Sequence, residues 1–424
     1  MLVLLTGATG FIGGHLLRAL LAAGHTVRAV ARREGPAIPG VEWVRGDFSA
    51  AHTPEAWAAA VAGVDAVVNA VGIIREVPGQ RFVDLHERAP VALFTAANAA
   101  GVRRLVQVSA LGSDDVSPEP YFRTRRVADR LVVQLGGSVI RPSFVWGPGD
   151  LSMRMFRSMA ALPVIPVVGD GAYRVQPVHV ADVVRALVAA AESERGGEWD
   201  VGGAESLSFN QLLDALRRRI GRRSPAVKLC VPLPLMRLVA GVGSATGIGP
   251  ITRDELSMLL RGSTCELGPF RERFGFVPRG FTEGLSTEAG ADREAMLAEV
   301  DAAVPLLRLT VGFIWLATPW ATWFGWPRAE SLALLAEAGI RGPFAGPIVD
   351  ATCVLEVGVG VATIFGWRLA WVGLVQLALV LGFSVILAVT GSPLWGHPFG
   401  PLTKNIPLVG AILLLIATRN RSAR

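Results

Sequence analysis

The chain has 424 residues, enough for two or three domains, and its net charge of +6 is carried almost wholly by arginine because Lys228 and Lys404 are its two lysines. The arginines are scattered without interleaved aromatic residues, which argues against nucleic-acid binding. Three widely spaced cysteines exclude a disulfide framework and lack metal-ligand spacing, and a hydrophobic fraction of 51% is too high for an ordinary soluble protein.

The first 145 residues alternate between strand-like and helix-like segments, which is typical of a Rossmann-like α/β fold with a doubly wound parallel sheet. Short apolar runs predict strands over residues 2–5, 26–31, 41–45, 66–70, 104–109 and 138–141. Longer amphipathic segments predict helices over residues 11–23, 54–62, 81–100 and 120–135.

A glycine-rich turn connects the first predicted strand to the first predicted helix. It contains Gly7, Thr9, Gly10, Phe11, Ile12 and Gly13. Glycines let the backbone approach phosphates closely, and a helix N-terminus offers N–H groups and the positive end of the helix dipole. A tight turn without a ligand is the alternative interpretation. The position between strand and helix favours a site for a dinucleotide pyrophosphate.

Residues 146–290 are less regular and indicate a smaller lobe that closes over the carboxyl edge of the sheet. A helix is predicted after residues 177–182, a short strand within 197–203 and another helix over 210–220. Ligands of open α/β sheets bind at that edge. We therefore expect this lobe to contribute the substrate site.

The composition becomes strongly apolar after residue 290. A linker helix is expected over residues 291–303. Apolar stretches of about 18–23 residues, each long enough to span or nearly span a bilayer, follow over residues 304–326, 346–365, 369–389 and 401–418. Tryptophans at their ends fit a membrane interface. The sequence thus predicts an all-α bundle of four transmembrane helices over residues 304–424.

The orientation of this multi-pass protein follows from where a dinucleotide-binding domain can work. The apolar start breaks at Gly7 without a preceding basic region, so no signal peptide is expected, and the N-terminal domain would lie in the cytoplasm at the cell (inner) membrane. Four spans return the C-terminus to the same side. The arginines then on the cytoplasmic side are Arg308, Arg368, Arg419, Arg421 and Arg424, against Arg328, Arg341 and Lys404 opposite.

Three charged residues are candidates for a site within the membrane. Asp350 and Glu356 lie in the second predicted span, where a carboxylate costs about a few kcal/mol or more and indicates a functional site by default. A neutral acid bonded within the bundle is the alternative for Glu356. Lys404 lies near the outer face, where it could pair with Asp350.

Further polar and small residues follow the predicted strands at fixed places. They are Asp47 and Phe48 after the third strand, Asn69, Ala70 and Gly72 after the fourth, Ser109 at the end of the fifth, and Arg141, Pro142 and Ser143 after the sixth. Together with the glycine turn and Tyr121, they make residues 1–290 resemble the short-chain dehydrogenase/reductase superfamily, in its extended or atypical branch. The similarity is greatest to proteins like the NAD(P)H-binding accessory subunit of respiratory complex I.

This resemblance implies a nicotinamide dinucleotide as cofactor. Residues 47–48 would meet the adenine, residues 69–72 the adenosine ribose, and residues 141–143 the nicotinamide. The second strand ends at Arg32 and Arg33, whose guanidinium groups suit a 2′-phosphate and offer no carboxylate to a 2′-hydroxyl. We therefore expect NADP(H) to be favoured over NAD(H), although a shift of one residue would bring Glu34 to the ribose.

The resemblance also implies a catalytic set. Tyr121 would be the acid/base and Ser109 would orient the substrate oxygen. The family lysine, four residues after the tyrosine, is replaced by Arg125. Four-residue spacing keeps both side chains on one helix face, and a positive charge would still favour the phenolate. Arginine donors point differently from those of lysine, so binding without turnover is the second interpretation.

The C-terminal stretch of residues 393–407 makes the membrane segment resemble the DoxX-like families. The resulting hypothesis is a membrane-anchored NAD(P)-dependent oxidoreductase that acts on a hydrophobic carbonyl, alcohol or quinone-like substrate. One alternative is a non-catalytic NADP(H)-binding sensor or assembly factor at the membrane. The other is an NAD-retaining epimerase of the extended branch, against which the arginine pair argues.

Overall fold

The computed structural model describes residues 1–113, 116–246, 249, 251–337, 339–389 and 403–418. The chain divides into two compact units, Met1–Ala295 and Met296–Arg424, which are described separately. The predicted stretch of residues 393–407 lies outside the described residues up to position 402, as do the arginines after residue 418.

The first unit is built on a parallel seven-stranded sheet with the order β11-β6-β5-β4-β1-β2-β3. Its strands are β1 (Leu2–Thr6), β2 (Thr26–Ala31), β3 (Val41–Arg45), β4 (Ala66–Asn69), β5 (Arg104–Val108), β6 (Ser138–Pro142) and β11 (Gly197–Val201). The chain order reverses between β1 and β4, whose parallel pairing runs from Val3 opposite Ala66 to Thr6 opposite Asn69. This reversal opens the crevice where ligands of doubly wound sheets bind.

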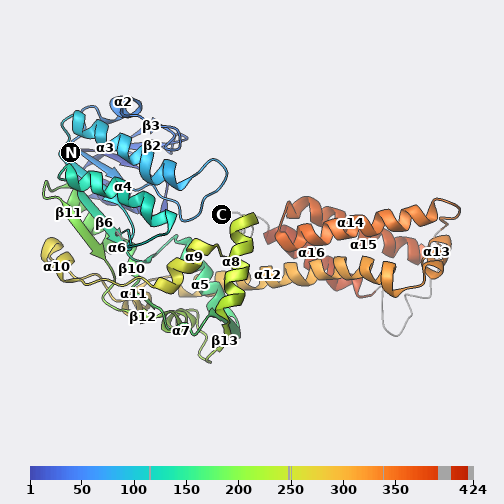
Figure 1. Ribbon diagram of the computed structural model, residues 1–424. Coiled ribbons are helices and arrows are strands. Elements are labelled where there is room, and N and C mark those ends of the chain that lie inside the picture. The colour runs from blue at the N-terminus through green and yellow to red at the C-terminus, as the bar shows by residue number, and fades with distance from the viewer. Residues whose placement is uncertain (114–115, 247–248, 250, 338, 390–402, 419–424) are drawn as a thin grey trace. The chain divides into compact units, whose positions relative to one another are not determined.

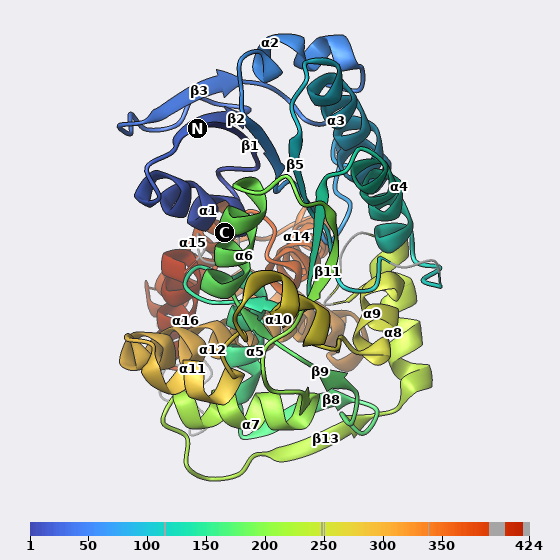
Figure 2. The ribbon, with the colours of Figure 1, turned by 90° about the vertical axis from the view of Figure 1, so that its left-hand side faces the viewer.

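Helices cover both faces of this sheet (Figure 2). On one face, α1 (Phe11–Ala22) and α6 (Val180–Ala191) pack their apolar sides against alternate strand residues such as Val3 and Leu5. On the other face lie the helices α3 (Ala89–Ala99) and α4 (Pro120–Gln134). Because strand side chains alternate between faces, Leu4 belongs to this second core.

The predicted strands and helices of the first 145 residues are present, with ends that differ by one or two residues. Two predicted helices divide: residues 54–62 form a 3-10 turn (Pro54–Trp57) followed by α2 (Ala58–Val61), and a π-helical segment (Val83–Arg88) precedes α3. The strand predicted within residues 197–203 was expected in the lobe but belongs to the main sheet. It is β11, which pairs in parallel with β6 and extends the main sheet, because α6 makes the crossover and Trp199 and Val201 are buried.

The lobe consists of short strand pairs and helices. Its pairs are β7 (Val145–Trp146) with β10 (Val178–His179), β9 (Arg174–Val175) with β12 (Leu207–Ser208), and β8 (Val164–Val168) with β13 (Val227–Val231). Its helices are α5 (Leu151–Ala161), α7 (Phe209–Arg219), α8 (Leu233–Thr246), α9 (Arg253–Arg261), α10 (Gly268–Phe274) and α11 (Phe281–Thr287).

The second unit is helical (Figure 1). Its helices are α12 (Ala291–Trp320, continued by the π-helical Ala321–Gly325), α13 (Arg328–Glu337), α14 (Ala345–Phe365), α15 (Leu369–Val389) and α16 (Asn405–Thr418). Within the described residues, three of these are long and apolar enough to cross a membrane: α12, α14 and α15. The predicted span over residues 401–418 contains α16, an apolar helix of 14 residues in the described part of the chain.

The long helices of this unit share one apolar core. Val311 and Trp315 of α12 lie in it with Val359 of α14, and α15 and α16 contribute further side chains. Arg308 of α12 donates hydrogen bonds to the carbonyl oxygens of Thr363 and Ile364, at the C-terminal end of α14. A positive charge at that end is stabilised by the helix dipole, and Arg308 shares the Thr363 carbonyl with the N–H of Gly366.

Candidate cofactor and active site

The glycine turn predicted to bind a pyrophosphate lies between β1 and α1, at the reversal of the sheet. Gly7 has a φ of +78° and lies so close to Ala70 that an added Cβ would stand 2.7 Å from its carbonyl group. A Cβ on Gly13 would overlap the carbonyl oxygen of Gly7. Among the described residues no side chain caps α1 at Gly10. The first N–H groups of α1 are thus available to an anion.

A buried polar network fixes the strand ends beneath this turn. Thr6 Oγ1 donates to Asn69 Oδ1 at 2.6 Å, and Asn69 Nδ2 donates to Gln107 Oε1 at 2.8 Å. The backbone N–H of Val71 also donates to Asn69 Oδ1. The network joins the ends of β1, β4 and β5 and positions the loop that contains Ala70. The sequence analysis did not select Thr6 and Gln107. Each is a polar residue near the end of an otherwise apolar strand, and this position could have identified it.

The two residues predicted to meet the adenine have different environments. Asp47 Oδ1 accepts hydrogen bonds from the N–H and hydroxyl of Ser49, and these bonds, with the charge of Arg32, lower the pKa of Asp47 despite partial burial. Phe48 is buried, with its ring edge-on to Trp57. Its side chain therefore belongs to the core, and only its backbone can contact a ligand.

The arginines predicted to select the cofactor follow β2 directly. Arg32, Arg33 and Glu34 are all exposed, beyond the end of the strand at Ala31. The charge of Arg32 acts on the carboxylate of Asp47, so these two side chains share one region beyond the carboxyl ends of β2 and β3. The residues at this edge can supply positive charge to a phosphate.

Tyr121 lies near the start of α4 in an aromatic cluster. It is buried, and its ring contacts the rings of Phe82, His86 and Phe122. Burial, with the charge of Arg125, lowers the pKa of His86 to about 2, so its ring is neutral at physiological pH. His86 Nε2 accepts a hydrogen bond from the N–H of Ile73. This neutral ring supports the loop after β4 and packs against Tyr121.

Arg125 connects Tyr121 to the end of β5. Its guanidinium carbon lies 4.9 Å from the centre of the Tyr121 ring, and its Nη1 donates to the carbonyl oxygen of Val108 at 3.1 Å. An added Cβ on Gly72 would overlap the Arg125 guanidinium. Arg125 thus links the ring of Tyr121 to the backbone beside Ser109, next to the loop of Gly72.

Ser109 is bonded to a residue that sequence reasoning missed. Its Oγ donates to Asp129 Oδ2 at 2.5 Å, and both side chains are buried. Burial raises the pKa of Asp129 to about 7, against the opposing effects of the Ser109 bond and of Arg125. Asp129 Oδ1 has no hydrogen-bond partner among the described residues. The signal was its position, eight residues after Tyr121 and four after Arg125, on the same face of α4.

The segment predicted to lie beside the nicotinamide is tied to neighbouring elements. Arg141 pairs with Asp200 at 2.8 Å and Glu198 at 3.2 Å, so its side chain is engaged with the adjacent strand β11. Ser143 is buried, and its hydroxyl lies 2.8 Å from that of Ser263. Pro142 ends β6. These side chains therefore have structural partners, and cofactor contacts would come from their backbone.

Helix α9 of the lobe covers the site on the side of Tyr121. Met258 of α9 packs against the cluster of Tyr121 and Phe122. Glu255 of α9 binds Arg75, in the loop after β4, with two hydrogen bonds of 2.6 and 3.0 Å. The lobe is thus held over the edge of the sheet by an ion pair and by apolar contacts.

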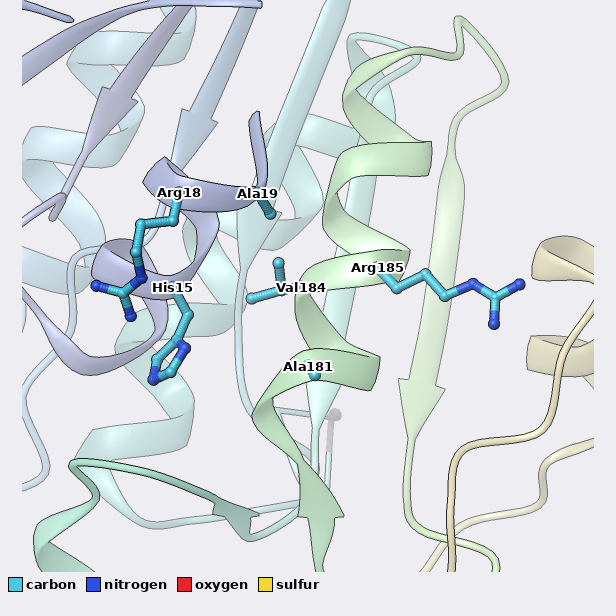
Figure 3. A pocket seen from close by; sticks show the side chains of 6 residues that line it. All are labelled: His15, Arg18, Ala19, Ala181, Val184 and Arg185. Atoms are coloured by element: carbon cyan, nitrogen blue, oxygen red, sulfur yellow. The ribbon is translucent and has the colours of Figure 1, made fainter. Parts of the chain in front are cut away.

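A pocket of about 410 Å³ lies elsewhere, between α1 and α6 (Figure 3). It is lined by His15, Arg18, Ala19, Ala181, Val184 and Arg185. His15 Nε2 lies 3.0 Å from the carbonyl oxygen of Pro148, and Figure 3 shows Arg185 pointing away from His15 and Arg18. This pocket contains none of the predicted cofactor or catalytic residues.

The candidate residues of the membrane unit have distinct partners. Asp350 pairs with Arg328 through two contacts of 2.9 and 2.8 Å, and it also accepts from the Trp323 indole. The structure therefore gives Asp350 a partner other than the suggested Lys404, which is exposed. Glu356 is buried on α14, as a carboxylate facing the helix bundle would be.

Comparison with known proteins identifies both parts of the chain. Residues 3–202 match the family model "NAD dependent epimerase/dehydratase family", and residues 312–413 match the "DoxX-like family". The chain is 30% identical over 334 residues to the 2-alkyl-3-oxoalkanoate reductase of Stenotrophomonas maltophilia, which covers 67% of this chain and 97% of that protein. It is 27% identical over 248 residues to the mitochondrial NADH dehydrogenase (ubiquinone) 1 alpha subcomplex subunit 9 of Arabidopsis thaliana, covering 55% and 61%.

Among solved structures, MoeE5 in complex with UDP-glucose and NAD is similar, with a TM-score of 0.52 and 25% identity over 69% of this chain and 99% of that one. These findings confirm the two resemblances, to the complex I subunit and to DoxX-like proteins, and they confirm the Rossmann-like fold. The solved relative binds NAD. The preference for NADP(H) stays a prediction.

Proposed function

This chain belongs to the NAD dependent epimerase/dehydratase family, and we propose that, with its DoxX-like domain, it is a membrane-anchored NAD(P)-dependent oxidoreductase. Its substrate would be a hydrophobic carbonyl, alcohol or quinone-like molecule. Residues 1–290 would form the cofactor and substrate domain, residues 291–303 a linker helix, and residues 304–424 the membrane domain, with the first domain and the C-terminus in the cytoplasm.

One observation carries the proposal: Arg125 lies over the ring of Tyr121 and is bonded to Val108, the residue before Ser109. This supports a site in which an acid, a cation and a hydroxyl act at the end of β5, near the crevice at which the sheet order reverses. Such a group, near a fold that can hold a dinucleotide, suits the reduction of a carbonyl or the reverse reaction.

The cofactor would be held by the glycine turn at Gly7, Gly10 and Gly13 and by the loop from Asn69 to Gly72. A bound nicotinamide supplies or accepts the hydride at the substrate carbon. In the reducing direction Tyr121 would give its hydroxyl proton to the substrate oxygen, which balances the hydride added at carbon. Arg125 would stabilise the resulting phenolate through its charge, and Ser109 would hold the substrate oxygen.

Support for NADP(H) comes from the edge beyond β2. Arg32 and Arg33 are exposed there, and the charge of Arg32 already acts on Asp47. Guanidinium groups form charge-assisted bonds with a phosphate, whereas a 2′-hydroxyl is usually bound by a carboxylate. We therefore propose that these arginines recognise the 2′-phosphate.

Support for a hydrophobic substrate comes from the membrane unit and from one relative. Three helices of the described chain are long and apolar enough to cross a membrane. The relative from Stenotrophomonas maltophilia is a 2-alkyl-3-oxoalkanoate reductase, a name that describes an oxo group with alkyl substituents. A quinone remains a second substrate class within the same proposal.

The test uses the full chain in lipid nanodiscs. NADPH consumption would be followed with a panel of alkyl ketones, 3-oxo acids, aldehydes and quinones, and NADPH binding would be measured separately. The wild type is expected to consume NADPH with at least one class. Tyr121→Phe should bind NADPH within about twofold of the wild type and lose about 10²-fold or more in turnover. Unchanged turnover in this variant would contradict the proposed role of Tyr121.

The bond between Ser109 and Asp129 favours a second candidate, a protein that binds NADP(H) without turning it over. In this arrangement the serine hydroxyl donates to a buried carboxylate, and arginine stands where the family has lysine. Saturable NADPH binding together with no consumption across the whole panel, in either direction, would favour this sensor or assembly factor over the oxidoreductase.

A further inference from the structure

The β8–β13 pair and α8, which begins two residues after the end of β13, expose large apolar side chains. These side chains are between 45% and 66% exposed, and they are Val164, Val227, Leu229, Leu235, Leu238 and Val242. We call these residues the lobe patch. Val227 lies opposite Val164 in the parallel register, so the two share one face, while Ile165 points inward and is fully buried. Exposed clusters of this kind mark interaction surfaces.

Helix α8 continues the lobe patch with an amphipathic arrangement. Leu235, Leu238 and Val242 have spacings of three and four residues, which place them on one helix face. Ala240, between them in sequence, is fully buried. The helix also packs against α9. With 14 residues it is too short to span a bilayer, but its length and apolar face suit a position in the plane of a membrane surface.

The chain segment that contains β13 and α8 is basic, and its one lysine, Lys228, is paired with Asp214. No Asp or Glu occurs in the sequence between Asp214 and Asp254, a segment that includes β13 and α8. The arginines of this segment with exposed side chains are Arg218, Arg222, Arg223, Arg237 and Arg253. Basic side chains around an apolar helix face are attracted to anionic lipid headgroups, at about 1 kcal/mol each near the surface. An acidic protein would also pair with these arginines. A bilayer is favoured as the partner because the same chain contains helices that are long and apolar enough to cross one.

The connection between the first unit and the apolar helices is short. Only three residues separate the end of α11 at Thr287 from the start of α12 at Ala291. From Ala295, the last residue of the first unit, nine residues of continuous helix lead to Val304, where the apolar part of α12 begins. At 1.5 Å per residue this is about 14 Å of helix. The end of the first unit is therefore joined to the apolar part of α12 by a short helical segment.

We propose that the lobe patch inserts into the headgroup layer of the membrane that holds α12, α14 and α15, with the exposed arginines at anionic phospholipids. The lobe is then a peripheral membrane module in addition to being tethered. If the proposed function holds, there is a further consequence. Because α8 packs against α9, and Met258 of α9 packs against the Tyr121 cluster, the lipid contact lies one helix away from the site of a lipid-borne substrate.

The test places a nitroxide label at position 238 of the full chain in nanodiscs of phosphatidylcholine and phosphatidylglycerol. Exposed Cys230 and half-buried Cys265 are replaced by serine, and buried Cys353 is kept because the label does not reach it. The matched control carries the label at Val127, an apolar and 42% exposed position on α4. Collision rates with oxygen, which concentrates in lipid, and with a water-soluble nickel complex are then compared.

We expect the label at Leu238 to collide with oxygen at least threefold more often, relative to nickel, than the label at Val127. In discs of phosphatidylcholine alone this ratio should fall toward the control. Equal ratios at the two positions would overturn the proposal, and so would protection from both reagents, which indicates coverage by protein. None of these readouts requires turnover or a bound dinucleotide, so their failure is distinct from a failure of the proposed oxidoreductase.

Discussion

Ser109 donates a hydrogen bond of 2.5 Å to Asp129, and this bond connects the end of β5 with the middle of α4 inside the fold. The same helix face presents Arg125 one turn earlier and Tyr121 two turns earlier. Asp129 thus competes with any substrate oxygen for the proton of the Ser109 hydroxyl. The protonation state of Asp129 affects which of the two acceptors the hydroxyl binds.

Asp129 gives the stability of the protein a pH dependence. Its pKa is raised to about 7, whereas an unfolded Asp titrates at about 3.9, so the folded state binds more protons between these values. The contribution of this group to folding therefore becomes more unfavourable as the pH rises from about 4 to about 7. Asp129→Asn should raise the unfolding temperature at pH 7.5 by several degrees, and the gain should shrink toward pH 4.

The measurement is thermal unfolding of the full chain in nanodiscs at several pH values. Asp292→Asn, which changes an exposed carboxylate at the start of α12, is the control for the loss of one carboxylate. A stabilisation by Asp129→Asn that is the same at pH 4 and pH 7.5 would show that Asp129 does not titrate in this range.

Arg125 can be tested by the residue that the family has in its place. Arg125→Lys should keep turnover within about tenfold, because a positive charge still favours the phenolate of Tyr121. Arg125→Met removes the charge and should reduce turnover by about 10²-fold. The check is a pH–rate profile of both variants with NADPH binding measured in parallel. If Met and Lys variants behave alike, the charge has no role in catalysis.

The glycine turn offers two neighbouring glycines with opposite expectations. A Cβ on Gly13 would overlap the backbone oxygen of Gly7, whereas a Cβ on Gly14 would stand 3.5 Å from the oxygen of Ala8, an ordinary contact. Gly13→Ala should therefore weaken dinucleotide binding at least tenfold and lower the unfolding temperature. Gly14→Ala should bind normally and be neutral or slightly stabilising, since alanine favours helix by about 1 kcal/mol over glycine. Titration calorimetry and thermal unfolding distinguish them.

Cofactor selectivity can be measured at the end of β2. Arg32→Ala should weaken NADPH binding by about tenfold, the value of about 1.4 kcal/mol for a charge-assisted contact, and leave NADH binding within about twofold. Arg18→Ala removes the same charge from α1, near the pocket between α1 and α6, and serves as the control. An equal loss for both nucleotides in Arg32→Ala would contradict recognition of a 2′-phosphate by this residue.

The inner strands of the sheet, β1, β4, β5 and β6, could be predicted from sequence because they are buried on both faces. Such strands are continuous apolar runs that end abruptly at polar residues or glycines, as β4 does at Asn69, so their limits are visible without a structure. The sequence pattern places the strand at Gly197–Val201 in the lobe because Glu198 and Asp200 interrupt its apolar run. Those carboxylates pair with Arg141, a partner 59 residues away from Asp200 in the chain.

The candidate site was predictable only in part, for a related reason. Local motifs gave the glycine turn and brought Tyr121 and Arg125 to one helix face, because these depend on neighbouring residues. The partners that define the site's electrostatics come from other elements. Asp129 lies on the buried helix face of Tyr121 and Arg125, and the three-dimensional structure is needed to show that its partner is Ser109.

The network of Thr6, Asn69 and Gln107 makes the edge of the sheet stiffer than the lobe that covers it. Buried side-chain hydrogen bonds join the ends of the adjacent strands β1, β4 and β5. The part of the sheet beneath the glycine turn is therefore resistant to deformation. The lobe is held over the sheet by weaker contacts, such as the solvent-accessible ion pair of Arg75 with Glu255. A bound nucleotide would therefore exchange through movement of the lobe, while the ends of β1, β4 and β5 stay in register.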